Sequence, residues 1–102
     1  EREYAVGSGR IDLVVRWPLP ADGHGRPRED RHAVELKVWR DGRKDPLPEG
    51  LVQLEKYLAR LGLDEGTLIL FDRRAAAPPL EERTHAETAT TASGRHVRVL
   101  RA

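Results

Sequence analysis

The feature that most constrains the fold is a strand, an amphipathic helix and a second strand in immediate succession. Residues 32–40 alternate apolar and polar side chains with the period of a strand. Pro46 opens a helix whose leucines form one apolar stripe to about Leu61, and Gly62 is a natural stop. Residues 67–71 form an apolar run too short for a helix, which predicts a strand buried on both faces. This order predicts two parallel strands joined by a right-handed crossover.

The flanking segments predict further strands. Residues 10–17 alternate as a strand does, and Gly7-Ser8-Gly9 predicts a tight turn after a short strand at 1–6. Pro18–Arg31 predicts an exposed, mobile loop with its tip near residues 22–25. The predictions for the C-terminal part are a short helix around residues 80–86, or little order, in 75–94, and a last edge strand at 96–101.

Length and composition narrow the class of protein. A chain of 102 residues with 38% hydrophobic residues predicts a single domain over 1–102. The absence of cysteine excludes disulfides and thiolate metal sites, and no apolar run is long enough to cross a membrane, so we expect a cytoplasmic protein. The net charge of +1 provides no global attraction for nucleic acid. Because no methionine is present, even at the start, we expect a C-terminal fragment of a longer protein.

Two carboxylates and one ammonium group are expected to converge. If the strands around the 18–31 loop pair as a hairpin centred between Gly23 and His24, Asp12 faces Glu35, and Lys37 lies on the same side. At about 5 Å and an effective dielectric of roughly 20, the two carboxylates repel by about 3 kcal/mol, which favours a bound cation.

A magnesium site is one interpretation of this cluster. Mg²⁺, or Mn²⁺, takes hard oxygen ligands, here Asp12, Glu35 and the carbonyl of Leu36, together with substrate phosphate oxygens. Lys37 would then orient the attacking water or stabilise charge on the phosphate, which suggests phosphodiester hydrolysis. An ordinary ion-paired, half-exposed sheet face explains the same residues and stays open.

The residues also resemble a known superfamily. Asp12 on one strand and Glu35-Leu36-Lys37 on the next are similar to the metal site of PD-(D/E)XK nucleases, and Gln53 and Tyr57 match the Gln-x-x-x-Tyr helix motif of its RecB-like branch. The resemblance implies an α/β fold of the restriction-endonuclease type, a three-layer α/β/α sandwich with a mixed sheet. It gives Gln53 and Tyr57 supporting roles, although their packing as an ordinary helix-surface pair stays open.

The segments around Glu35-Leu36-Lys37, Gln53 and Phe71-Asp72-Arg73-Arg74 are similar to the C-terminal nuclease-like domain of bacterial proteins with an AAA-type ATPase module. This implies an N-terminal ATPase partner on the same chain. The family core begins with a helix, and we expect this first core helix to be missing from residues 1–102.

Basic residues follow the two parallel strands, where ligands often lie. The candidate DNA-binding residues are Arg40, Arg43, Lys44, Arg73 and Arg74, although charged residues at strand ends are more often simply solvated. Three functions therefore stay open. They are a Mg²⁺-dependent DNA nuclease, an inactive nuclease-fold module that binds nucleic acid or regulates an ATPase, and a protein-interaction domain.

Overall fold

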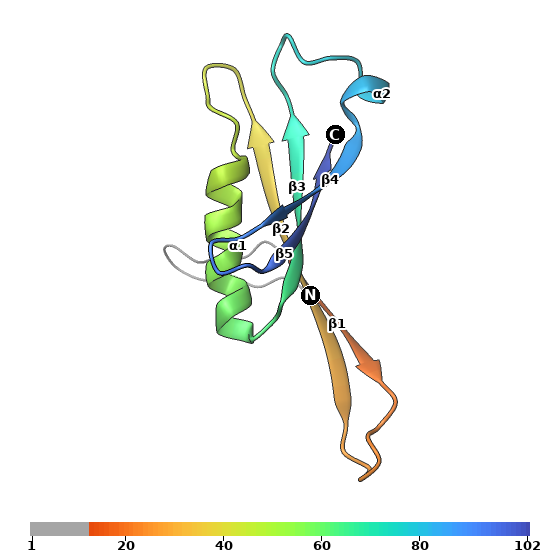
Figure 1. The fold of residues 1–102 in the computed structure, drawn as a ribbon. Helices are drawn as coiled ribbons and strands as arrows, with labels where there is room; N and C mark the ends of the chain where they lie inside the picture. The colour runs from red at the N-terminus through yellow and green to blue at the C-terminus, as the bar shows by residue number, and fades with distance from the viewer. Residues whose placement is uncertain (1–12) are drawn as a thin grey trace.

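One five-stranded mixed sheet organises the part of the chain that the structure, a computed structural model, describes, namely Leu13–Ala102 (Figure 1). The strand order is β1-β2-β3-β5-β4, and α1 lies against one face. The elements in chain order are β1 (Leu13–Leu19), β2 (Arg28–Trp39), α1 (Leu47–Leu61), β3 (Glu65–Asp72), α2 (Leu80–Arg83), β4 (His85–Thr90) and β5 (His96–Arg101). The predicted α/β class is confirmed. The strand predicted at 1–6 and the turn at Gly7-Ser8-Gly9 lie outside the described residues.

The register of the first hairpin agrees with the sequence prediction. Strands β1 and β2 are antiparallel, with Leu13 paired to Val34 and Leu19 paired to Arg28. The hairpin is therefore centred between residues 23 and 24, as predicted. Register matters because a shift of one residue would turn every side chain of the strand to the other face.

The predicted loop at Pro18–Arg31 is too long. Both strands run into it, and the connection is residues 20–27, because the backbones of these outer residues pair although their side chains are exposed. The carboxylate of Asp22 accepts the backbone N–H of His24 at 2.8 Å, and Gly25 has a φ of 74° that closes the turn. Figure 1 shows this hairpin projecting beyond the rest of the sheet.

The predicted crossover is confirmed. Helix α1 joins β2 to β3, and these two strands are parallel. The carboxylate of Asp45 accepts the N–H of Leu47 at the start of α1, and Gly62 ends the helix in the left-handed conformation with a φ of 71°.

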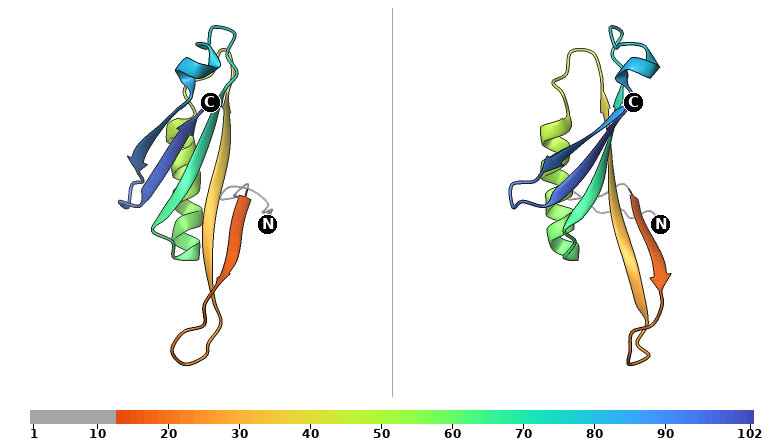
Figure 2. Two further views of the ribbon diagram at one scale, coloured as in Figure 1. Left: turned by 90° about the vertical axis from the view of Figure 1, so that its right-hand side faces the viewer. Right: turned by 45° about the vertical axis from the view of Figure 1, so that its right-hand side comes forward.

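One face of β3 is more open than predicted. Leu68 and Leu70 point toward α1 and are buried, whereas Ile69 and Phe71 on the other face are partly exposed. Within Leu13–Ala102 no helix lies over that second face (Figure 2). The expectation of burial on both faces is therefore wrong for β3.

The hydrophobic core lies between α1 and the sheet. Its fully or almost fully buried residues come from four strands and the helix, and they are Val14, Ala33, Leu54, Tyr57, Leu58, Leu68, Leu70, Val97 and Val99. The described residues contain no helix long and apolar enough to cross a membrane.

The C-terminal strands correct two predictions. The strand at His96–Arg101 is present, but it pairs with β3 on one side and β4 on the other, so it is internal and β4 forms the edge. Residues 75–94 hold both α2 and the strand β4. The alternating Ala, Glu and Thr residues of β4 carry a weak strand signal, because their side chains bury little apolar surface.

A polar cluster fastens the turn between β4 and β5 to the helix. The Glu55 carboxylate accepts hydrogen bonds from the hydroxyls of Thr91 and Ser93 and pairs with the guanidinium of Arg95 at 2.9 Å. The hydrogen bonds from Ser93 and Thr91, opposed by burial and helped by Arg95, lower the pKa of Glu55.

Candidate functional site

The Glu-x-Lys pair of β2 lies on the face of the sheet that α1 covers. Glu35 is 2% exposed and is flanked along this face by the core residue Ala33 and by Lys37. Glu35 and Lys37 are two residues apart on one strand, so their Cα atoms are separated by about 7 Å. A carboxylate buried this deeply requires compensating partners.

Helix α1 supplies the other side of the site. The ammonium of Lys37 lies 3.3 Å from the Oε1 of Glu49, and the amide Nε2 of Gln53 donates to the same oxygen at 3.3 Å. Tyr57, one turn further along α1, is 4% exposed and belongs to the core. The structure therefore connects Lys37 and Gln53 through Glu49, and it buries Glu35 on β2 and Tyr57 on α1.

Glu49 belongs to this cluster and is missing from the predicted site. Its Oε1 accepts hydrogen bonds from both Lys37 and Gln53, so the Glu49 carboxylate connects the two residues. Its position four residues before Gln53 and in the first turn of the helix is the sequence signal that places it on the same helix face.

Two further metal ligands are predicted from the sequence, Asp12 and the carbonyl of Leu36. Asp12 lies outside the described residues, so the prediction that it faces Glu35 stays a prediction. Leu36 directs its side chain to the opposite, open face of the sheet and is 42% exposed. The prediction for Leu36 concerns its carbonyl oxygen and stays a prediction as well.

The oxygen atoms near Lys37 are of the chemical type that binds a hard divalent cation. Around Lys37, Glu35 and Glu49 offer carboxylate oxygens, the ligands that Mg²⁺ and Mn²⁺ prefer. Within Leu13–Ala102 no group of three or more His, Cys, Asp or Glu side chains is gathered closely enough to hold a metal ion.

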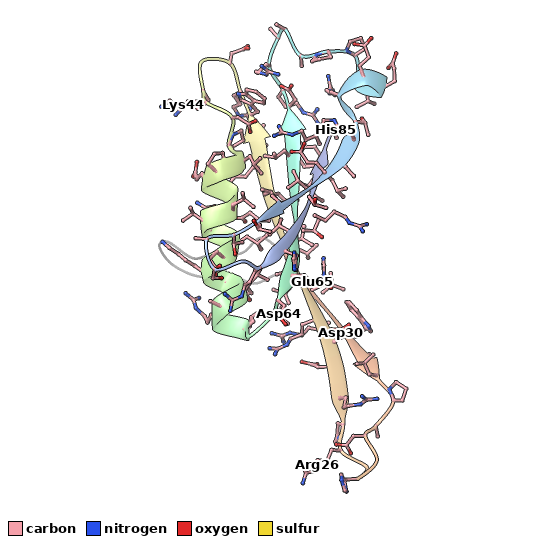
Figure 3. The ribbon with its side chains drawn as sticks, in the orientation of Figure 1. Arg26, Asp30, Lys44, Asp64, Glu65 and His85 are labelled. Carbon is pink, nitrogen blue, oxygen red and sulfur yellow. The ribbon has the colours of Figure 1, made fainter. Side chains whose placement is uncertain are left out.

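The predicted DNA-binding residues gather at one end of the sheet. Arg40, Arg43 and Lys44 are exposed in the loop after β2, and Arg73 is exposed after β3. The N–H of Ala75 donates to the Asp41 carboxylate at 3.0 Å, which holds the two loops together. Figure 3 shows Lys44 and His85 at this end of the molecule and Arg26 at the far tip of the hairpin.

The guanidinium of Arg74 makes its contacts with other residues of the protein. Its guanidinium forms a bidentate pair with Asp72 at 2.9 and 2.7 Å and stacks on the Trp39 ring at 3.5 Å. The hydrogen bonds from Arg74, opposed by burial, lower the pKa of Asp72 to about 2. The Trp39 Nε1–H donates to the carbonyl of Arg43 at 2.9 Å, so the indole is held from two sides.

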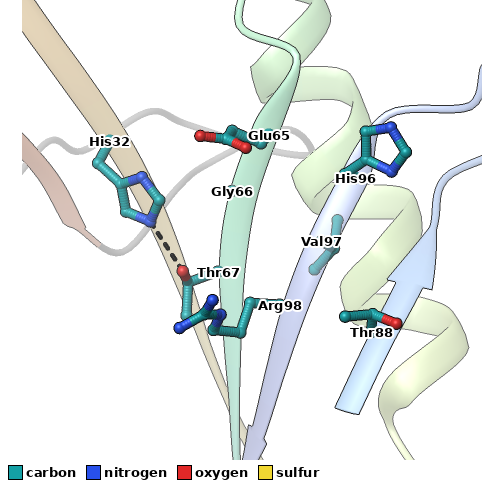
Figure 4. A pocket seen from close by; sticks show the side chains of 8 residues that line it. All are labelled: His32, Glu65, Gly66, Thr67, Thr88, His96, Val97 and Arg98. Atoms are coloured by element: carbon teal, nitrogen blue, oxygen red, sulfur yellow. Dashed lines mark hydrogen bonds between the residues drawn. The ribbon is translucent and has the colours of Figure 1, made fainter. Parts of the chain in front are cut away.

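A different hollow lies on the open face of the sheet. It has a volume of about 450 Å³ and collects His32, Glu65, Thr67 and His96 from three strands (Figure 4). The Nε2 of His32 and the Oγ1 of Thr67 are hydrogen-bonded at 2.7 Å. The proximity of His32 and His96 could not be predicted from the sequence, because the two residues lie on strands far apart in the chain. This hollow is on the opposite face from Glu35 and Lys37.

Comparison of the chain with family models, with curated proteins and with solved structures finds no match.

Proposed function

We propose that the protein is a metal-dependent nuclease domain that hydrolyses DNA phosphodiester bonds. The observation that carries the proposal is the placement of Glu35, 2% exposed, beside Lys37 on the sheet face under α1. A buried carboxylate next to a fixed ammonium group is the arrangement that metal-assisted phosphodiester hydrolysis needs.

The topology supports a fold of the restriction-endonuclease type. An antiparallel hairpin leads through one helix into a parallel strand, which is the order that the resemblance implies for the strand pair and helix around such a site. DNA as substrate and an N-terminal ATPase domain on the same chain are parts of the same proposal.

Each residue has a proposed role. Glu35, with Asp12 and the carbonyl of Leu36, would hold Mg²⁺. When bound, this ion would polarise the substrate phosphate and activate a water molecule. Lys37 would stabilise negative charge on the phosphate, and the bond to Glu49 holds its ammonium in place. Gln53 orients Glu49.

The basic end of the sheet would position the DNA. Arg40, Arg43 and Lys44 present cationic groups beside the site, where phosphates would lie, whereas the guanidinium of Arg73 lies 5.5 Å from the centre of the Phe71 ring on the open face. Because Arg74 is paired with Asp72, we assign it the role of fixing Trp39 instead of binding phosphate.

The decisive test compares cleavage by matched variants. Purified protein is incubated with linear, supercoiled and single-stranded DNA in Mg²⁺ or Mn²⁺. Glu35→Gln and Lys37→Ala are expected to lower the rate about a hundredfold or more. Glu65→Gln, an exposed carboxylate on the opposite sheet face, and Lys56→Ala, an exposed lysine on α1, are the controls and should retain activity.

Calorimetric titration with Mn²⁺ adds an independent measurement. Wild-type protein is expected to bind the ion, and Glu35→Gln and Asp12→Asn are expected to bind it at least tenfold more weakly. Cleavage that survives both substitutions would refute the assignment. DNA binding without metal binding or cleavage would instead identify an inactive nuclease-fold module.

A further inference from the structure

A cavity of about 300 Å³ lies beside the candidate site, at the carboxyl ends of the parallel strands. It is on the same sheet face as Lys37, because Leu70, which lines it, is the direct β3 partner of Lys37 in the sheet register. Trp39, two residues beyond Lys37 on β2, lines it as well. The loop after β3, α2 and the start of β4 complete its walls.

The cavity combines an apolar wall with one unsatisfied donor. Trp39, Leu70 and Pro78 supply the apolar wall, and the indole of Trp39 is held in position by Arg43 and Arg74. Arg83 also lines the cavity. Its Nη1 donates to the carbonyl of Pro78 at 3.0 Å, whereas its buried Nε–H has no hydrogen-bond partner within the described residues.

A buried N–H without an acceptor is costly, so a ligand oxygen placed there would be bound favourably. A charged oxygen is the best acceptor for a guanidinium donor, and phosphate geometry suits it. The ligand that fits this cavity therefore has a flat apolar part and an anionic oxygen.

We propose that the cavity binds one nucleotide of the DNA strand, with the base against Trp39, Leu70 and Pro78 and a phosphate oxygen accepting the Arg83 Nε–H. The choice of a nucleotide among anionic ligands rests on the proposed nuclease function. Lys37 and Trp39 are about 7 Å apart along β2, so the cavity takes a nucleotide next to the phosphate under attack.

Tryptophan fluorescence provides the readout. The chain has two tryptophans, and the exposed Trp17 lies on the hairpin, so the variant Trp17→Phe leaves Trp39 as the sole emitter. We expect deoxyadenosine monophosphate to change this emission saturably. Deoxyadenosine alone and inorganic phosphate alone should each bind at least tenfold more weakly.

Substitutions of Arg83 test the assigned contact. In the Trp17→Phe background, Arg83→Lys keeps the charge but removes the Nε donor, and Arg83→Gln removes both. Each is expected to weaken monophosphate binding at least tenfold, whereas Arg60→Gln, an exposed arginine on α1, should leave it unchanged. In the unsubstituted Arg83 protein, the ¹⁵N resonance of the Arg83 Nε–H should shift during the same titration, which tests the contact without a mutation.

The possible outcomes separate the two proposals. Glu35→Gln should bind the monophosphate as tightly as wild type and fail to cleave DNA. Saturable, Arg83-dependent binding in a protein without nuclease activity would support the nucleotide site and contradict the nuclease. Cleavage without any saturable monophosphate binding, equal affinity for inorganic phosphate, or affinity unchanged by both Arg83 substitutions would overturn the nucleotide site alone.

Discussion

At the residue scale, a carboxylate with a lowered pKa, Asp72, supports the structure around the site. Asp72 is paired with Arg74, and Arg74 in turn stacks on Trp39. The aspartate side chain is only 13% exposed, so its ion pair is better protected from water than an ordinary surface pair. One carboxylate thereby fixes the aromatic wall of the cavity.

The pKa of Asp72 gives this pair a testable pH dependence. Because the pKa is lowered from 3.8 to about 2, the stabilisation is complete above pH 4 and is lost as the pH falls through about 2. We expect Asp72→Asn to lower the free energy of unfolding by about 1 to 2 kcal/mol at pH 7. Thermal unfolding followed by circular dichroism at pH 7, 5, 3 and 2 measures it.

The difference between wild type and Asp72→Asn should shrink between pH 4 and pH 2. The exposed carboxylate variant Glu81→Gln on α2 serves as the control and should unfold as wild type does. A difference in stability that is the same at pH 7 and pH 2 would contradict the role of the charged pair.

At the element scale, the distance between α1 and the sheet depends on Gly50. A Cβ atom at this position would lie 2.9 Å from both methyl carbons of Leu68 and 3.4 Å from the Cγ of Lys37. Leu68 is fully buried, so its methyl groups have little room to move. The missing side chain therefore lets the helix approach the strands at the level of Lys37.

Gly50→Ala tests this close approach. Alanine is intrinsically better in a helix by about 1 kcal/mol, but overpacking typically costs about 1 to 3 kcal/mol, so we expect a net loss of up to about 2 kcal/mol. We also expect slower DNA cleavage, because α1 carries Glu49 and Gln53. Denaturant unfolding and cleavage assays measure the two effects, with the exposed Val52→Ala as control. A more stable Gly50→Ala protein with full activity would show that the contact is not tight.

The elements with strong local signals could be predicted from the sequence. Helix α1 ends at Gly62 as expected, and the hairpin is centred where the spacing of its strands indicates. Strand β4 was missed because its Ala and Thr residues bury little, and its place at the sheet edge depends on pairing with β5. The contact of Glu49 with Lys37 could not be predicted, because side-chain partners on two different elements leave no periodic pattern in the sequence.

At the scale of the whole molecule, the hairpin arm stands apart from the core. The arm comprises the outer parts of β1 and β2 and their connection, residues 15–31, and its large apolar residues Val15, Trp17 and Leu19 are each more than a third exposed. Its connection therefore contributes little to the hydrophobic stabilisation of the domain.

A shortened arm should fold as the natural one does. Replacing residues 20–27 by Asn-Gly joins Leu19 to Arg28 through a two-residue turn that keeps their pairing. We expect the unfolding temperature to change by no more than about 5 °C, since the change in free energy should stay below about 1 kcal/mol. Circular dichroism measures this, and DNA cleavage checks that the site is intact. Loss of cooperative unfolding would show that the connection is needed for folding.

Strand β2 is one uninterrupted backbone of 12 residues. Its outer part pairs with β1, whereas residues 34–39, which include Glu35 and Lys37, pair with β3. A macromolecule that binds and pulls on the arm would therefore transmit the force along the backbone of this strand to Glu35 and Lys37. The projecting hairpin makes the domain mechanically responsive, because a load applied far from the site reaches it through covalent bonds.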